Sequence, residues 1–207
     1  DGQEFGNSVL CVDVSFDAGI VVSGSEDRTV RVCRGQNRAV GRGHMGTVWG
    51  IALLKGDETF VSGSWDRTLR VWDLECTCLR VVEVGRVVWS LALSPCKTTV
   101  AAGQDDGFVT LFSAETWAKV WEEEVHQNIV RSVAFHGRYL ATGSDDKTAK
   151  ILDADTGRVI KSLERGHELP IRSIAFTSHG TSLITTDFGK TLRQWPLHAE
   201  STKQMAS

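Results

Sequence analysis

Three residues of one segment, His44, Ser62 and Asp66, have the side-chain types that a nucleophilic hydrolase uses. In such enzymes a histidine takes the proton of a serine hydroxyl while a carboxylate orients the imidazole. Neither a GxSxG nucleophile elbow nor a recognisable oxyanion donor accompanies this trio. The phosphate, dinucleotide and zinc-protease motifs GxxxxGK(S/T), GxGxxG and HExxH are also missing from the sequence. We therefore expect no catalytic residue, no cofactor and no enzymatic activity.

Metal binding is the second chemistry that the residue types raise. One residue separates Cys76 from Cys78, whereas structural zinc pairs usually have two to four residues between them, and no second pair or nearby histidine completes four ligands. The cysteines are Cys11, Cys33, Cys76, Cys78 and Cys96. Their number is odd and their spacing is not that of a disulfide framework. We predict no metal site, and reduced thiols in an intracellular protein, either cytoplasmic or nuclear.

A repeated segment must position all of these residues. It consists of a short apolar strand that ends in small residues, a turn with Asp, then Thr or a similar residue, and a second apolar strand, and it occurs five times. The first four copies are marked by Gly24, Gly63, Gly103 and Gly143, at separations of 39, 40 and 40 residues, and Thr186 stands in this position 43 residues further on. Such a period is typical of the blades of a β-propeller.

Each unit contains enough strands for one blade. It opens with an alternating strand, such as Val48 to Leu53 or Val130 to Phe135, and no helical periodicity is visible in the chain. Weaker strands follow the third strand of the first four units, at Arg38 to Val40, Leu79 to Val84, Ala118 to Val125 and Arg158 to Leu163. A single sheet would leave one face unburied, so we expect the units to stack face to face around an axis.

Several of these segments resemble the WD-repeat family. Gly43-His44, Val61 to Asp66 and Val71-Trp72-Asp73 together resemble one complete repeat, and Gly166-His167 with Trp195 resembles another. The resemblance covers the chain from about Val9 to Trp195 and implies an all-β propeller of four-stranded antiparallel blades. The expected domain spans residues 1–207, with repeats at about 9–42, 43–86, 87–125, 126–165 and 166–196 and a polar tail at 197–207.

The number of blades stays open at this point. The sequence contains five repeats, begins with Asp1 rather than Met, and has a polar stretch after Trp195 in place of a clear last strand. A five-bladed ring, an arc completed by another chain and a part of a larger propeller all fit these features.

The family resemblance implies a structural role for the trio. In WD repeats these positions form a buried hydrogen-bond chain with a tryptophan, here His44, Ser62, Asp66 and Trp72. Matched position by position, only this unit has all four residue types. The fifth unit has His167, Thr185 and Trp195, but Gly189 stands at its Asp position.

The resemblance also implies a partner-binding face at one end of the propeller. The matching positions that we select are Trp49, Trp65, Trp89, Leu10, Asp105, Arg131, Arg172 and Phe188. Tryptophan and arginine are enriched among the residues that dominate binding energy, and three tryptophans from two adjacent blades would gather on one arc. The alternative interpretation places the tryptophans between the blades as ordinary core.

Charge and hydropathy narrow the class of partner. A net charge of −3 and a pI near 6.1 do not provide the positive field that binds phosphates, so nucleic acid is disfavoured. No apolar run reaches the roughly 18 residues that cross a bilayer, so we expect no membrane partner. We predict a non-catalytic scaffold that binds a protein or peptide within a multi-protein complex. The alternative is an RNA-associated structural subunit of a ribonucleoprotein assembly.

Overall fold

Antiparallel β-sheets make up the structure. The computed structural model describes residues 6–15 and 17–197 of the 207 residues, so the expected polar tail lies outside the described residues except for Leu197. The described part of the chain contains nineteen strands in five sheets, and its one helical element is the 3-10 turn η1 (Asp105–Gly107). Four sheets have four strands and one has three. The predicted all-β fold of antiparallel blades is confirmed.

The strands follow the repeats in chain order. The first sheet contains β1 (Val9–Ser15), β2 (Ile20–Ser25), β3 (Thr29–Arg34) and β4 (Asn37–Arg42), and the second contains β5 (Val48–Leu53), β6 (Thr59–Ser64), β7 (Thr68–Asp73) and β8 (Cys78–Glu83). The third contains β9 (Val88–Leu93), β10 (Thr99–Gln104), β11 (Phe108–Ser113) and β12 (Lys119–Glu124). The fourth contains β13 (Val130–His136), β14 (Tyr139–Ser144), β15 (Ala149–Asp153) and β16 (Val159–Leu163), and the fifth contains β17 (Ile171–Phe176), β18 (Ser182–Asp187) and β19 (Leu192–Pro196).

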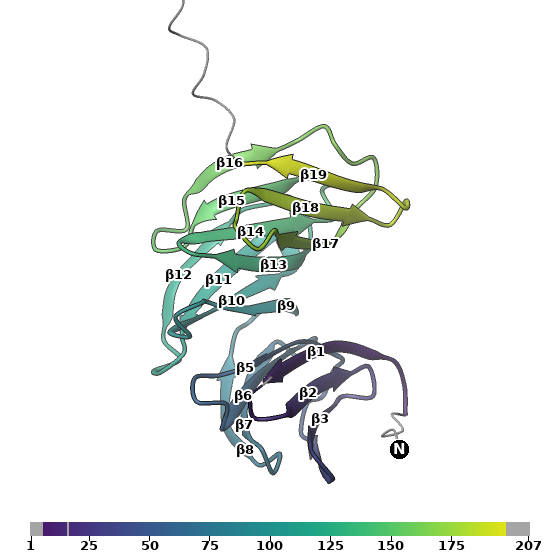
Figure 1. The fold of residues 1–207 in the computed structure, drawn as a ribbon, viewed down its shortest axis with the longest axis vertical. Helices are drawn as coiled ribbons and strands as arrows, with labels where there is room; N and C mark the ends of the chain where they lie inside the picture. The colour runs from purple at the N-terminus through teal and green to yellow at the C-terminus, as the bar shows by residue number, and fades with distance from the viewer. Residues whose placement is uncertain (1–5, 16, 198–207) are drawn as a thin grey trace, which may run out of the picture.

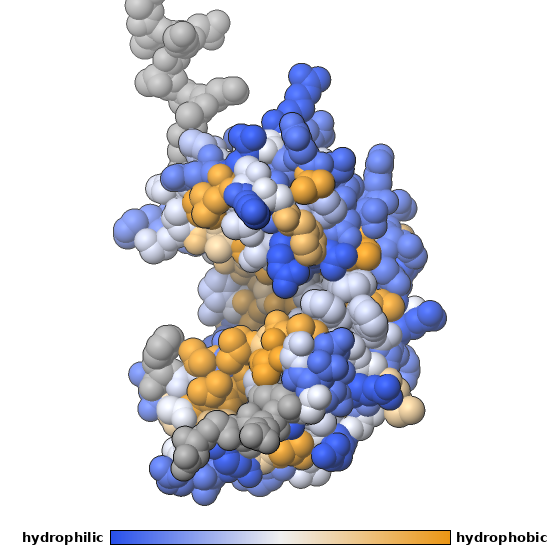
Figure 2. Space-filling view, turned by 90° about the vertical axis from the view of Figure 1, so that its right-hand side faces the viewer, coloured by the Kyte–Doolittle hydropathy of each residue, from blue (hydrophilic) through white to orange (hydrophobic). Residues whose placement is uncertain are grey.

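The five sheets follow one another along an arc (Figure 1). Their first strands, β1, β5, β9, β13 and β17, contact one another in this order and line the axis, while the later strands of each sheet lie further out. An opening separates the first sheet from the fifth (Figures 1 and 2). Of the arrangements that the sequence left open, the described residues therefore form an open arc and not a closed five-bladed ring.

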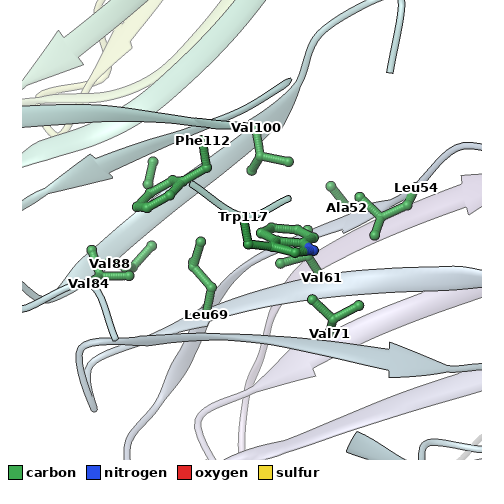
Figure 3. Close-up of a cluster of buried hydrophobic side chains, with 11 residues drawn as sticks. Ala52, Leu54, Val61, Leu69, Val71, Val84, Val88, Val100, Phe112 and Trp117 are labelled. Atoms are coloured by element: carbon green, nitrogen blue, oxygen red, sulfur yellow. The ribbon is translucent and has the colours of Figure 1, made fainter. Parts of the chain in front are cut away.

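A hydrophobic core fills each of the four interfaces between neighbouring sheets. Between the second and third sheets, Val61, Leu69 and Val71 face Val100 and Phe112, with Trp117 between them (Figure 3). The buried residues alternate along the middle strands with residues of the other face, as the period of two requires. The sheets between the first and the fifth have apolar residues on both faces, so each packs against a neighbour on either side. This packing fixes the relative positions of the strand ends.

The glycine that marks each repeat is explained by the sheet that follows it. A Cβ at Gly24 would lie 2.5 Å from Val48 Cγ1, and a Cβ at Gly63 would lie 2.5 Å from Val88 Cγ1. A Cβ at Gly143 would lie 2.7 Å from Ile174 Cγ2, so the next sheet comes too close for any side chain. In the fifth unit Thr186 stands at this position, and no described sheet packs on it.

Gly63→Thr tests this explanation. We expect it to lower the free energy of unfolding by about 1 to 3 kcal/mol, because the added atoms overlap Val88 in a filled interface. The matched control is Thr186→Gly, whose cost is limited to the backbone entropy of glycine, about 0.5 to 1 kcal/mol. Urea denaturation of both variants measures the two values, and equal losses would contradict the role of the following sheet.

The first sheet exposes a face whose counterpart in the second sheet is buried. Val9, Val12, Val14 and Val21 match, by position, Val48, Ile51, Leu53 and Phe60 of the second sheet. The four residues of the second sheet are at most 7% exposed, whereas Val12 is 61% exposed. Hydrophobic surface is visible on this lower wall of the opening (Figure 2). The first sheet therefore has the residues of an interface, although no described sheet covers it.

Candidate functional site

The trio of His44, Ser62 and Asp66 forms a continuous hydrogen-bond chain in the second sheet. The imidazole Nδ1 lies 2.7 Å from Asp66 Oδ2, and its Nε2 lies 2.7 Å from Ser62 Oγ. Trp72 Nε1 donates to the same hydroxyl at 2.8 Å, and Thr68 Oγ1 donates to Asp66 Oδ1 at 2.7 Å. These bonds join the loop before β5 to β6, the following turn and β7.

Although the distances resemble those of a hydrolase triad, the environment of the serine does not. Ser62 is fully buried, and its hydroxyl already bonds both His44 and Trp72. A nucleophile must reach a substrate carbonyl, and here the surrounding sheet occupies that space. The chain of bonds satisfies polar groups that would otherwise be buried without partners.

The hydrogen bonds of this network keep Asp66 ionised. Burial by itself would raise the pKa of Asp66, but hydrogen bonds from His44 and Thr68 outweigh burial and hold this pKa well below its usual range. Burial lowers the pKa of His44 below its ordinary value of 6.5, and the hydrogen bond to Asp66 offsets this only in part. The favoured state is a neutral imidazole beside a carboxylate.

Acid is therefore expected to destabilise the fold in two steps. Because the pKa of His44 is lower in the folded chain, the unfolded chain binds the additional proton below about pH 6.5, and stability falls as the pH decreases from 7 to 5. The depressed pKa of Asp66 adds stability above about pH 4, which is lost on further acidification. Thermal melts at these pH values measure the effect. In His44→Gln the decrease between pH 7 and 5 should be smaller, and an unchanged slope would contradict the assignment.

Equivalent networks occur in the fourth and fifth sheets. In the fourth, His126 lies 2.9 Å from Asp146 and 2.8 Å from Thr142. In the fifth, His167 lies 2.8 Å from Asp187 and 2.6 Å from Thr185, and Trp195 donates to Thr185 at 2.8 Å.

The fifth sheet corrects the sequence analysis. The prediction that only the second unit contains all four members was wrong, because Asp187, two residues before Gly189, supplies the carboxylate from the end of β18. The hydrogen bond from His167 lowers the pKa of Asp187 to about 2. Asp187 is visible in the sequence, but it lies two residues before the position that matches Asp66.

A β-bulge places one residue of every innermost strand on the same face of the arc, at one end of its central axis. The pairing of each first strand with its neighbour skips one residue. The skipped residues are Leu10, Trp49, Trp89, Arg131 and Arg172. A bulge interrupts the alternation and re-aims a side chain. All five residues line an axial cavity of about 560 Å³.

The turn after each second strand places a further residue next to the bulge. Its backbone N–H donates to the carbonyl two residues before the bulge, as in the bond from Trp65 to Thr47 at 3.0 Å. The turn residues are Glu26, Trp65, Asp105, Asp145 and Phe188. The bulges and turns thus place all eight selected residues, from five sheets, on one face of the arc, at one end of its central axis.

Three of these residues form an aromatic cluster. The ring centroid of Trp49 lies 6.0 Å from that of Trp65 and 5.1 Å from that of Trp89, and Trp65 lies 5.3 Å from Trp89. Trp65 is 44% exposed, while Trp49 and Trp89 are partly buried. None of the three belongs to a hydrophobic core cluster between the described sheets. The geometry therefore disagrees with the interpretation of these tryptophans as ordinary core.

Two arginines and a phenylalanine extend the cluster across the fourth and fifth sheets. The Arg131 guanidinium lies 4.7 Å from the ring centroid of Trp89 and 5.4 Å from that of Phe188. The Arg172 guanidinium lies 5.2 Å from the Phe188 ring centroid. Arg131 also donates two hydrogen bonds to Asp145, at 2.5 and 2.7 Å. We call Trp65, Trp49, Trp89, Arg131, Phe188 and Arg172 the tryptophan–arginine ridge.

The remaining selected residues flank the ridge. Leu10 lines the axial cavity on the side of the first sheet. Asp105 begins η1, and its Oδ1 atom is buried and has no hydrogen-bond partner among the described residues. The pairing of Asp145 with Arg131 was not foreseen from the sequence, which showed the two residues but not the bulge that brings them together.

Other chemistry finds no support in the described residues. Cys76 belongs to the core between the first two sheets, and burial raises its pKa to about 11. Residues 6–15 and 17–197 contain no group of three or more His, Cys, Asp or Glu that could hold a metal ion. Nor does this part of the chain contain a helix that is long and apolar enough to span a membrane.

Two family models match the sequence. The model described as "WD domain, G-beta repeat" matches residues 2–33 and 35–73. The model described as "Anaphase-promoting complex subunit 4 WD40 domain" matches residues 91–179. Both models describe WD repeats, and together they reach all five sheets, although only the first strand of the fifth sheet is matched.

Similar proteins include WD-repeat proteins of known name. The chain is 28% identical over 179 residues to WD repeat-containing protein VIP3 of Arabidopsis thaliana, covering 76% of this chain and 56% of VIP3. It is 30% identical over 147 residues to target of rapamycin complex subunit wat1 of Schizosaccharomyces pombe, covering 68% and 46%. The chain thus spans about half the length of these relatives. The WD40 β-propeller domain of Doa1 has the same fold, with a TM-score of 0.79 and 21% identity, over 87% of this chain and 62% of the Doa1 chain.

Proposed function

Because the chain belongs to the WD-repeat β-propeller family, we propose that it is a non-catalytic scaffold that binds a protein partner through the tryptophan–arginine ridge. The observation that carries the proposal is the ridge itself. Its aromatic and guanidinium groups come from four sheets and lie in continuous contact on one axial face of the arc. The burial of the His44, Ser62 and Asp66 chain supports the absence of catalysis. We further propose an intracellular role as one subunit of a complex. The name of the relative wat1 describes that protein as a complex subunit.

Physical chemistry favours binding at this surface. Trp65 and Phe188 are 44% and 49% exposed, so large apolar groups contact water in the free chain. A partner that covers them removes this apolar area from water, and tryptophan and arginine are the residue types that most often anchor such interfaces. The strands behind the ridge are fixed by hydrophobic cores, so little backbone order must be gained on binding.

Site-specific photocrosslinking tests the proposal. A photoreactive phenylalanine analogue at Phe188 should crosslink a protein partner in cells, because this side chain is exposed on the ridge. The same analogue at Val81, which is 44% exposed on the outer strand β8, is the matched control. A partner captured equally from both positions, or from Val81 alone, would contradict the assignment of the binding face.

RNA association is the competing function. Aromatic rings and arginines can stack on bases, and the ridge contains both. The acidic residues Glu26, Asp105 and Asp145 lie in the turns of the same face, however, and the chain has a net charge of −3. This distribution opposes a polyphosphate backbone. Retention of RNA that weakens steeply with salt would favour the RNA function, whereas salt-tolerant capture of a protein favours the scaffold.

A further inference from the structure

We propose that the tryptophan–arginine ridge recognises an extended, proline-containing peptide segment that has an acidic side chain at one end. The inference rests on the proposed function and adds the chemical class of the partner. It is carried by three features of the ridge: unpaired indole donors, contiguous aromatic rings and an exposed guanidinium without a carboxylate partner.

The indole donors require a hydrogen-bond acceptor. The Nε1–H groups of Trp49 and Trp89 are buried and have no acceptor among the described residues. An unpaired buried donor costs free energy, which a ligand recovers when it supplies an oxygen. Trp65 contacts both rings and is the most exposed of the three, so a ligand that packs on Trp65 lies next to these donors.

A polyproline segment has the matching groups. Its backbone makes no internal hydrogen bonds, so its carbonyl oxygens are free to accept from indole N–H groups. Its rings are apolar and already ordered, and such segments dock on grooves lined by aromatic side chains. An α-helical ligand would use most of its carbonyls internally and would leave the indole donors unpaired.

The arginines determine the charge of the ligand. Arg131 is neutralised by its two hydrogen bonds to Asp145. Arg172 is exposed, lies against the Phe188 ring and has no carboxylate partner among the described residues. A carboxylate at the end of the peptide would pair with Arg172. A cationic ligand in the aromatic cluster is disfavoured, because the Arg131 guanidinium already occupies the cation–π position on the Trp89 ring, 4.7 Å from its centroid.

Fluorescence anisotropy with defined peptides tests the inference on the full chain. The probe is a labelled peptide of consecutive prolines followed by aspartates, made also in the reverse order because the direction of binding is free. One control peptide replaces the prolines by alanines, and the other replaces the aspartates by lysines. The protein variants are Trp65→Ala and Arg172→Gln, with Arg193→Gln on β19 as the matched arginine control.

We expect one order of the proline–aspartate probe to bind at least tenfold more tightly than either control peptide. Trp65→Ala should weaken this binding at least tenfold and Arg172→Gln about fivefold, while Arg193→Gln leaves it unchanged. Equal binding of the alanine control, or no binding of either order, would overturn the inference. A protein captured by the crosslinker at Phe188 in that case shows that the proposed function stands and only the peptide class is wrong. Salt-dependent binding of oligouridine at the ridge in place of the peptide would overturn both.

Discussion

Trp72→Ala is expected to lower the free energy of unfolding by about 3 to 5 kcal/mol. The indole is 1% exposed, lies 6.3 Å from the Phe60 ring in a stacked arrangement, and belongs to the core between the first two sheets. Its removal leaves a cavity there and deprives Ser62 of a donor. Because the first sheet contacts the rest of the structure through this core, we expect its strands to lose protection first.

Urea denaturation measures this loss, and Trp195→Ala is the matched control. Trp195 makes the equivalent hydrogen bond to Thr185 but lies in the fifth sheet, where it is only partly buried. Its substitution should cost clearly less. Trp72→Phe separates the two contributions, since it keeps most of the apolar volume and loses the N–H. A loss below about 1 kcal/mol for Trp72→Ala would contradict the placement of this indole in the core.

Trp65→Ala is expected to weaken binding of the crosslinked partner by about 2 kcal/mol or more, roughly thirtyfold in Kd. The side chain is the most exposed of the aromatic cluster and contacts both other indoles, so it is placed to anchor a ligand. The same variant should lose much less stability than Trp72→Ala, because Trp65 lies outside the hydrophobic cores.

Titration calorimetry and thermal melts on this one variant separate binding from folding. Val81→Ala on β8 is the control, since it removes an equally exposed apolar group far along the sheet from the axis. Normal affinity combined with a melting temperature as low as that of Trp72→Ala would show that Trp65 is a core residue, as the alternative interpretation holds.

The repeat architecture could be predicted because its signals are local. Gly24, Gly63, Gly103 and Gly143 recur at a nearly constant spacing, and the structure explains each by the close approach of the next sheet. The outer strands were also visible in the sequence, although β4 extends beyond the predicted Arg38 to Val40. The open arc could not be predicted, since it depends on which sheet faces meet.

The site was predicted in part. Family positions selected Trp49, Trp65 and Trp89, and the bulges explain why Trp49 and Trp89 leave the alternation of their strands. A bulge leaves little trace in a sequence, because the unpaired residue is of no special type. Two features of the site depend on the direction of side chains in three dimensions. One is the pairing of Arg131 with Asp145, and the other is that Asp187 supplies the carboxylate of the fifth network, where the matching position holds Gly189.

Hydrogen–deuterium exchange with the crosslinked partner bound tests the binding face most directly. The chain offers an internal control, because the turns at residues 54–58 and 95–98 join the first and second strands of their sheets at the opposite end. Partner binding should slow exchange around Trp49, Trp65 and Trp89 and leave these two turns unchanged. Protection confined to the turns at 54–58 and 95–98, with none around the tryptophans, would contradict the ridge as the site of partner binding.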